Sequence, residues 1–312
     1  MRTLFRAFVA LIVVILLVVL GWYLLAGRLQ TPGPGPTPGP EQPQSQPADC
    51  PDVLAVAIPG TWESTATDDP YNPTAMPASL MQSITRPLQE QFSPERLTVY
   101  TVPYVAQFSN PIALPPDGQQ SYNNSRSEGT ARTIDIIAQT HARCALTKYI
   151  LTGFSQGAVI AGDVAARIGN GEGPVSADLV LGTALIADGR RDADSGIQVN
   201  PGIGGVGAEV ALGGLDLPGI TMTGSRPTEF GALNDRVYEI CNPTDMICAS
   251  PTDALSPANI PNSLAVLIGS IGNPAHAMYA SFVVDDAGTT ATEWVTRWAA
   301  DLTNNTPEVP HS

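Results

Sequence analysis

Ser155 lies at the centre of Gly153-Phe-Ser-Gln-Gly157, which matches the pattern G-x-S-x-G. An apolar run at residues 149–152 precedes this pentapeptide and an alanine-rich run at 158–166 follows it, which predicts a strand, a tight turn and a helix. Such a turn strains the backbone of the serine and presents its hydroxyl at the amino end of the helix. The pattern therefore predicts that Ser155 is a nucleophile, and the alternative is an ordinary strand-to-helix turn.

A nucleophilic serine needs a base, and the chain has three histidines, His141, His276 and His311. When a serine lies on this kind of turn, the order along the chain is serine, acid, histidine. His141 precedes Ser155 and ends a predicted helix, and His311 is the second-last residue. We therefore expect His276 to be the base.

The base needs a carboxylate that orients it, and Asp245 is the first candidate. It lies in Cys241-Asn-Pro-Thr-Asp-Met-Ile-Cys248, directly after a predicted strand, so that two cysteines bracket it. Asp253 also precedes the histidine, but it lies in a longer loop. We expect Asp245 to be the acid, with Asp253 as the second candidate.

The four cysteines, Cys50, Cys144, Cys241 and Cys248, allow three disulfide pairings. A bond between Cys241 and Cys248 would close a short loop around the acid. A bond between Cys50 and Cys144 would tie the start of the folded domain to the segment before the nucleophile. Metal binding is the alternative, but the spacings are unlike those of zinc sites. We expect neither a metal nor a cofactor.

The oxyanion formed when a serine attacks a carbonyl needs two donors. One is expected from the main chain of Gln156, directly after the nucleophile. The other is expected from the loop at residues 58–64, where Gly60 allows close approach and Thr61 offers its N–H and its hydroxyl. Trp62 in the same loop is either an apolar wall for an acyl chain or a packing residue.

Strand-like and helix-like segments alternate along the chain, which predicts an α/β fold with a mostly parallel sheet between two layers of helices. Short apolar runs predict strands at residues 53–58, 97–105, 149–153, 179–187 and 237–241. Helical spacing of apolar residues predicts helices at 78–92, 127–142, 156–168 and 292–304.

Two regions, residues 188–227 and 256–272, do not follow this alternation. The first is rich in glycine and contains a literal G-x-G-x-x-G match at residues 202–207. A dinucleotide-binding fingerprint requires a strand directly before it and a helix directly after it. Asn200-Pro201 precedes this match and a further glycine pair follows soon after. We therefore expect a long irregular excursion rather than a nucleotide site.

The amino terminus, residues 1–28, is predicted to be a membrane anchor, because two arginines precede an uncharged apolar run at 7–26. A cleaved signal peptide is the alternative, but its apolar region normally spans only roughly 7–15 residues. A Pro/Gly-rich linker is predicted at 29–49, the folded domain at 50–304 and a flexible tail at 305–312. We expect a single-pass protein of the cell membrane with its folded domain outside the cytoplasm, or a secreted protein if the anchor is cleaved.

Composition excludes two broad classes of protein. The formal net charge of −14 excludes a nucleic-acid-binding protein, because phosphate binding needs clustered basic residues. The hydrophobic content of 43% excludes a disordered chain. We expect a monomer.

These motifs resemble the cutinase family. The resemblance rests on the Gly-Phe-Ser-Gln-Gly turn, on the Cys-x-x-x-Asp-x-x-Cys loop and on Gly-Thr-x-Glu after the first strand, and it covers roughly residues 50–304. The anchor, the segment 57–64 and the glycine-rich excursion are more similar to the cutinase-like proteins of mycobacteria and related mycolic-acid bacteria, in particular an envelope phospholipase/thioesterase.

The resemblance implies an α/β-hydrolase fold, two disulfides, a Ser155–His276–Asp245 triad and an oxyanion hole from Thr61 and Gln156. It also implies hydrolysis of fatty-acyl esters or thioesters of cell-envelope lipids. The alternatives are an acyltransferase with the same triad and a non-catalytic lipid-binding protein.

The step of 31 residues from Asp245 to His276 is longer than in fungal cutinases and contains an apolar segment at 260–268. We expect this segment to form a flap or an acyl-binding wall, and the alternative is a packed surface helix.

Overall fold

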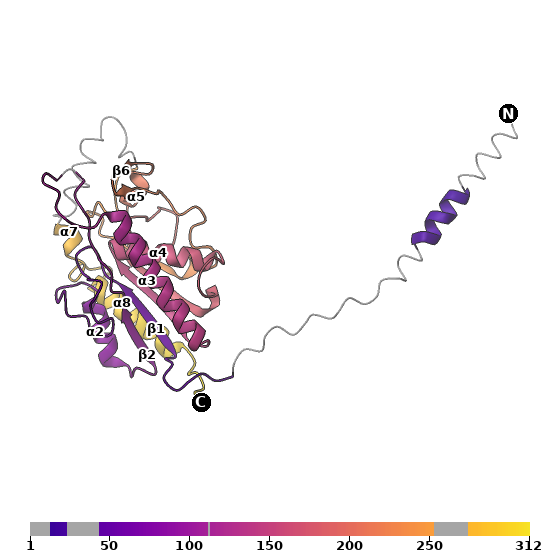
Figure 1. Ribbon diagram of the computed structural model, residues 1–312, viewed down its shortest axis with the longest axis horizontal. Helices are drawn as coiled ribbons and strands as arrows, with labels where there is room; N and C mark the ends of the chain where they lie inside the picture. Colours follow the sequence, from indigo (N-terminus) through magenta and orange to yellow (C-terminus); the bar gives the residue numbers. More distant parts are fainter. Residues whose placement is uncertain (1–12, 24–43, 112, 253–273) are drawn as a thin grey trace. The chain divides into compact units, whose positions relative to one another are not determined.

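The computed structural model describes residues 13–23, 44–111, 113–252 and 274–312. The chain divides into two compact units, Met1–Gln42 and Pro43–Ser312. In the first unit the described residues form a helix over 13–23 (Figure 1). No helix among the described residues is long and apolar enough to cross a bilayer. The rest of the predicted anchor and most of the predicted linker lie outside the described residues, so the anchor stays a prediction.

The second unit is built on a parallel sheet of six strands in the order β2-β1-β3-β4-β8-β5. The strands are β1 (Val53–Ile58), β2 (Leu97–Thr101), β3 (Lys148–Phe154), β4 (Val180–Ile186), β5 (Ile197–Gln198) and β8 (Val237–Ile240). Five of them were predicted, although β2 ends at Thr101 rather than at residue 105. The sixth, β5, comes from the glycine-rich excursion and pairs with β8 at the edge of the sheet.

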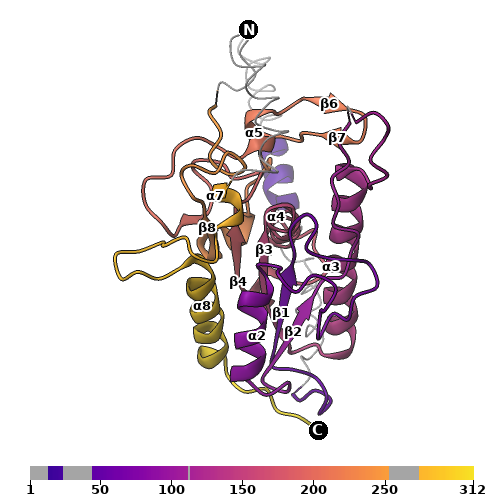
Figure 2. The same cartoon turned by 90° about the vertical axis from the view of Figure 1, so that its left-hand side faces the viewer.

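Helices cover both faces of this sheet, as the alternation predicts (Figure 2). Among the described residues of this unit, the helices of eight or more residues are α2 (Gln82–Gln91), α3 (Tyr122–Arg143), α4 (Gln156–Gly169) and α8 (Ala291–Asn305). Strand β1 shows how the layers form. Val53, Ala55 and Ala57 pack into the core beneath α2 and α8, and the alternate residues of β1 pack into the core beneath α3 and α4. The sheet is therefore buried on both faces, as in other parallel sheets.

Helix α3 begins at Tyr122, earlier than the predicted residue 127. Ser121 caps it, because the Ser121 hydroxyl accepts a hydrogen bond from the N–H of Asn124. The extra turn brings Tyr122 and Ser125 into the buried interior. The polar stretch at 121–127 hides this start from a search for apolar spacing.

The glycine-rich excursion is more ordered than expected. It contains β5, a short helix α5 (Ala208–Ala211) and a two-stranded hairpin of β6 (Asp216–Leu217) and β7 (Ile220–Thr221). Helix α5 and the hairpin share a small apolar core. The buried guanidinium of Arg191 donates to the carbonyl oxygens of Gly204 (2.9 Å) and Gly205 (2.7 Å). A Cβ on Gly205 would lie 2.2 Å from the carbonyl oxygen of Ser250, so this glycine serves close packing.

The two ends of this unit are joined to each other. Gln46 donates its N–H to the carbonyl oxygen of Pro310 (2.9 Å), and its own carbonyl oxygen accepts from the N–H of Ser312 (3.0 Å). His311 Nε2 lies 2.9 Å from the carbonyl oxygen of Cys50. The tail at 305–312, expected to be flexible, is therefore held against residues that precede the predicted domain start.

Candidate active site

Ser155 joins β3 to α4 in a strained turn, with φ 55° and ψ −121°. A positive φ costs energy for a residue with a side chain, so the surrounding structure must enforce it. A Cβ on Gly153 would lie 2.2 Å from the carbonyl oxygen of Gly157, and a Cβ on Gly157 would lie 2.1 Å from the carbonyl oxygen of Ile58. Both glycines of the pentapeptide are thus sterically required.

His276 lies in the short helix α7 (Pro274–Ala277) and contacts both of its expected partners. Its Nε2 is 2.9 Å from Oγ of Ser155, and its Nδ1 is 2.8 Å from Oδ2 of Asp245. The ring of Phe154 stacks on the imidazole with 5.0 Å between the ring centroids and 26° between the planes. The strand that presents the serine therefore also supports the plane of the histidine.

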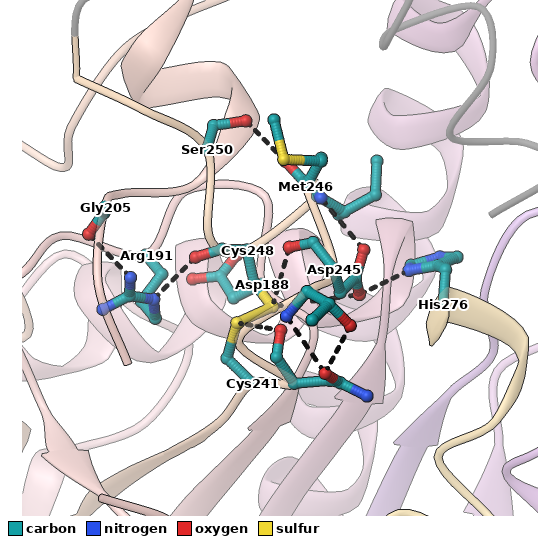
Figure 3. The surroundings of a disulfide bond; sticks show 12 residues. Asp188, Arg191, Gly205, Cys241, Asp245, Met246, Cys248, Ser250 and His276 are labelled. Atoms are coloured by element: carbon teal, nitrogen blue, oxygen red, sulfur yellow. Dashed lines mark hydrogen bonds and ion pairs between the residues drawn. A yellow bond between two sulfur atoms is a disulfide. The ribbon is translucent and has the colours of Figure 1, made fainter. Parts of the chain in front are cut away.

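Asp245 follows β8 in a loop that the Cys241–Cys248 disulfide closes, and it points toward His276 (Figure 3). The carboxylate is fully buried. Its Oδ1 accepts from the N–H of Ile247 (3.0 Å), and its Oδ2 accepts from the phenol of Tyr279 (2.9 Å) as well as facing the imidazole. A buried carboxylate is tolerated only with such partners.

Both disulfides that the resemblance implied are present. Cys241–Cys248 spans 7 residues around the acid. Cys50–Cys144 spans 94 residues and joins the segment before β1 to the residue that follows α3. Arg191 also stabilises the acid loop, because its Nε donates to the carbonyl oxygen of Cys248 (2.7 Å; Figure 3).

Glu63 fixes the loop after β1. Its carboxylate accepts a hydrogen bond from the N–H of Gly60 (3.1 Å) and another from the N–H of Leu80 (2.7 Å), which lies just before α2. Burial raises the pKa of Glu63, and these hydrogen bonds offset part of that effect. Oγ1 of Thr61 lies 3.2 Å from Oε1 of Gln156, which joins this loop to the first turn of α4.

Thr61 and Gln156 each offer a main-chain N–H beside Ser155. Within the described part of the chain, neither N–H donates to another protein group. Both residues line the same cavity as Ser155. Two free donors beside a serine hydroxyl are what an oxyanion requires.

Ser155 and His276 open onto a cavity of about 380 Å³. Most side chains in its wall are apolar, among them Trp62, Leu80, Phe108, Val159, Met222 and Ile247. Trp62 is 39% exposed, and its indole Nε1 donates to Oε1 of Gln119 (2.6 Å). Trp62 therefore lies in the wall of the cavity, where its hydrogen bond to Gln119 holds the indole.

Buried ion pairs support one side of this cavity. Glu209 in the wall pairs with Arg126 (3.0 Å), which also pairs with Asp163 (2.5 Å). Asp163 in turn pairs with Arg226 (3.0 Å), which pairs with Asp188 (2.6 Å). Burial opposes ionisation of Asp163, yet Arg226 and Arg126 lower the pKa of this carboxyl overall. Among the described residues, no group of His, Cys, Asp or Glu is arranged to hold a metal ion.

The structure brings together the five residues expected at the site, Ser155, His276, Asp245, Thr61 and Gln156. Asp253 and the segment 256–272 lie outside the described residues. Three contributions were not predicted, namely the ring of Phe154, the phenol of Tyr279 and the carboxylate of Glu63. Phe154 and Glu63 stand in the motifs that carry the resemblance, and Tyr279 follows His276 by three residues, but the sequence assigned none of them a role.

The parallel sheet, with a strained serine turn between β3 and α4, defines an α/β-hydrolase. A family model described as cutinase matches residues 67–260. The chain is 46% identical over 281 residues to a protein named carboxylesterase Culp6 homolog from Corynebacterium glutamicum, with 88% of each chain covered. The protein belongs to the cutinase family and is a carboxylic ester hydrolase.

Two solved structures are similar to this chain at low identity. A cutinase-like protein from Cryptococcus sp. is 17% identical with a TM-score of 0.50, covering 86% of this chain and all of the other. The catalytic core of an acetyl xylan esterase from Trichoderma reesei is 15% identical with a TM-score of 0.48, covering 83% and 100%. At 17% identity, the likeness to the Cryptococcus protein shows the fold alone.

Proposed function

We propose that this carboxylic ester hydrolase cleaves fatty-acyl esters and thioesters of lipids through a Ser155–His276–Asp245 triad. The observation that carries the proposal is the unbroken line of contacts from Ser155 Oγ to His276 Nε2 (2.9 Å) and from His276 Nδ1 to Asp245 Oδ2 (2.8 Å). The largely apolar wall of the adjoining cavity supports an acyl substrate.

In the acylation step, His276 takes the proton of Ser155 as Oγ bonds to the carbonyl carbon of the substrate. The N–H groups of Thr61 and Gln156 hold the oxyanion. Asp245 orients the imidazole and stabilises its protonated form. His276 then gives the proton to the leaving oxygen or sulfur as that bond breaks. Water repeats the sequence on the acyl-enzyme and releases the fatty acid.

Cavity size indicates the acyl length that is held in full. The cavity of about 380 Å³ has a largely apolar wall, so an acyl chain that covers more of this wall buries more apolar surface. We expect kcat/KM to rise with acyl length until the chain extends beyond the cavity.

The proposed setting is the cell envelope. Two disulfides are typical of proteins that work in an oxidising compartment. With the anchor and linker expected at residues 1–49, the enzyme would be tethered to the cell membrane and act as a monomer on envelope lipids outside the cytoplasm. The carboxylesterase name of the Corynebacterium relative supports esters as the first substrates to test.

The test compares Ser155→Ala with Ser83→Ala, which removes an exposed serine that lines the same cavity. The full chain in detergent is assayed on esters and acyl thioesters of increasing length and labelled with a fluorophosphonate. Ser155→Ala should lose labelling and about 10⁴-fold or more in kcat with unchanged thermal unfolding, whereas Ser83→Ala keeps both. Turnover or labelling that survives in Ser155→Ala overturns the proposal, and an inert wild-type enzyme favours a non-catalytic lipid-binding protein.

A further inference from the structure

Tyr279 is a fully buried phenol between the acid loop and the histidine. Its oxygen lies 2.9 Å from Oδ2 of Asp245 and 2.9 Å from the main-chain nitrogen of Asn242, and it lies 3.3 Å from Sγ of Cys248. A main-chain N–H can only donate, so the phenol oxygen accepts from Asn242. The single phenol proton is therefore directed to Asp245.

The ring that carries this hydroxyl cannot shift easily. It packs edge-on against Phe154 and Phe282, each with 5.7 Å between centroids, and lies 6.4 Å from the His276 ring at 87°. Phe154 is the residue before the nucleophile. One side chain thus contacts the strand of the serine, the loop of the acid and the helix of the histidine.

We infer that Tyr279 is a positioning residue of the proposed triad, which holds the carboxylate of Asp245 in place and takes up part of its charge. The inference rests on the proposed function. Tyr279 and His276 share Oδ2, while Oδ1 accepts from the N–H of Ile247. With the phenol present, the carboxylate cannot rotate away from the imidazole without losing a buried hydrogen bond.

The surrounding charges keep the phenol a donor. Burial, and after it the Asp245 carboxylate, raises the pKa of Tyr279 well above its usual range, while Arg191 acts in the opposite direction. The titratable or charged groups that face the phenol are Asp245 in the acid loop, His276 in α7 and Arg191 in the excursion. The raised pKa keeps the phenol protonated, so it remains a donor to Asp245.

The test is Tyr279→Phe, which removes the hydroxyl and keeps the ring. The loss of one hydrogen bond to a charged group should lower kcat about tenfold, with KM changed less than about twofold. With one donor fewer, the carboxylate holds the protonated imidazole more firmly. The acid limb of the kcat/KM profile should therefore move to higher pH, by about half a unit. Active sites are counted with a fluorophosphonate, so that misfolded protein does not lower kcat.

The matched control is Tyr149→Phe. Tyr149 is also fully buried, and its hydroxyl donates to the carbonyl oxygen of Ile137 (3.3 Å) in the other core. This variant should lose stability without any change in the pH profile. If Tyr279→Phe changes stability alone, as this control does, the positioning role is wrong.

A second measurement replaces Tyr279 with 2,3-difluorotyrosine, whose phenol is the stronger donor. The acid limb should then move to lower pH, opposite to the shift in Tyr279→Phe, and an unmoved limb contradicts the inference. Failure of the proposed function is distinguishable from both outcomes, because it would appear as turnover that survives in Ser155→Ala.

Discussion

The turn that presents the nucleophile and the loops that carry the acid and the base are held by different forces. Ser155 is fixed by main-chain sterics, because Gly153 and Gly157 leave no room for a side chain. Asp245 and His276 are fixed by side chains, through the Cys241–Cys248 bond and contacts with Tyr279 and Phe154. The nucleophile thus depends on close main-chain packing within its turn and against β1, whereas the other two depend on side-chain contacts.

The two regions also differ in how far apart along the chain their contacting residues lie. Ser155 lies between a strand and a helix that are adjacent along the chain. His276 meets Asp245 across 31 residues and Ser155 across 121 residues. A contact of that kind forms only when the whole sheet is in place. We therefore expect a steric clash at the turn to reduce activity more than the loss of a side-chain contact in the loops.

Among changes that leave the three residues of the proposed triad in place, the largest effect is expected from Gly157→Ala. The new Cβ would lie 2.1 Å from the carbonyl oxygen of Ile58, so β1 and α4 must separate. A displacement of about 1 Å at a catalytic group costs about 100-fold in kcat, and an overpacked interior costs about 3 kcal/mol of unfolding free energy. Urea denaturation and ester hydrolysis measure the two losses.

Gly204→Ala is the control for this variant. A Cβ at Gly204 meets nothing within 4 Å, and its φ is not in the left-handed region. It should therefore behave as wild type. Full activity in Gly157→Ala would show that main-chain sterics do not fix the nucleophile.

The second prediction compares the two disulfides. In the loop-entropy relation, removing Cys50–Cys144, which spans 94 residues, costs about 5 kcal/mol, and removing Cys241–Cys248, which spans 7, costs about 2.5 kcal/mol. Turnover should show the reverse order. Replacement of Cys241 and Cys248 by alanine should lower kcat about 20-fold, a factor equivalent to about 1.8 kcal/mol of transition-state stabilisation. Replacement of Cys50 and Cys144 by alanine should lower kcat less than about twofold.

Thermal unfolding and active-site-normalised kcat separate these two effects. Each double variant also serves as the control for the other. A larger fall in kcat for the Cys50 and Cys144 pair would mean that the acid loop does not need its disulfide.

Sequence could predict whatever depends on local pattern. The strands, the Ser155 turn and the Asp245 loop all carry motifs within a few residues, and the scarcity of histidines left His276 as the base. Sequence could not predict that Tyr279 donates to Asp245, because one buried tyrosine looks like another until the fold places it. The edge strand β5 was missed because two residues carry no periodic signal.

The smallest effect is expected from Phe154→Leu, which tests the one contact that joins the two regions. The Phe154 ring follows β3 on the nucleophile side and stacks on His276 at 5.0 Å. Leucine preserves most of the apolar volume but loses the flat face, so the imidazole gains freedom to tilt away from Ser155. We expect kcat to fall about fivefold and stability to fall by about 1 kcal/mol.

Phe230→Leu is the matched control, because Phe230 is also buried and its ring lies 5.2 Å from the guanidinium of Arg226, away from His276. It should lose similar stability at unchanged kcat. If the two variants have equal kcat, the stacked ring is core packing only, and the two halves of the site are joined solely through hydrogen bonds. If Phe154→Leu alone is slowed, the side chain next to the nucleophile also holds its base, and the pentapeptide positions two members of the proposed triad.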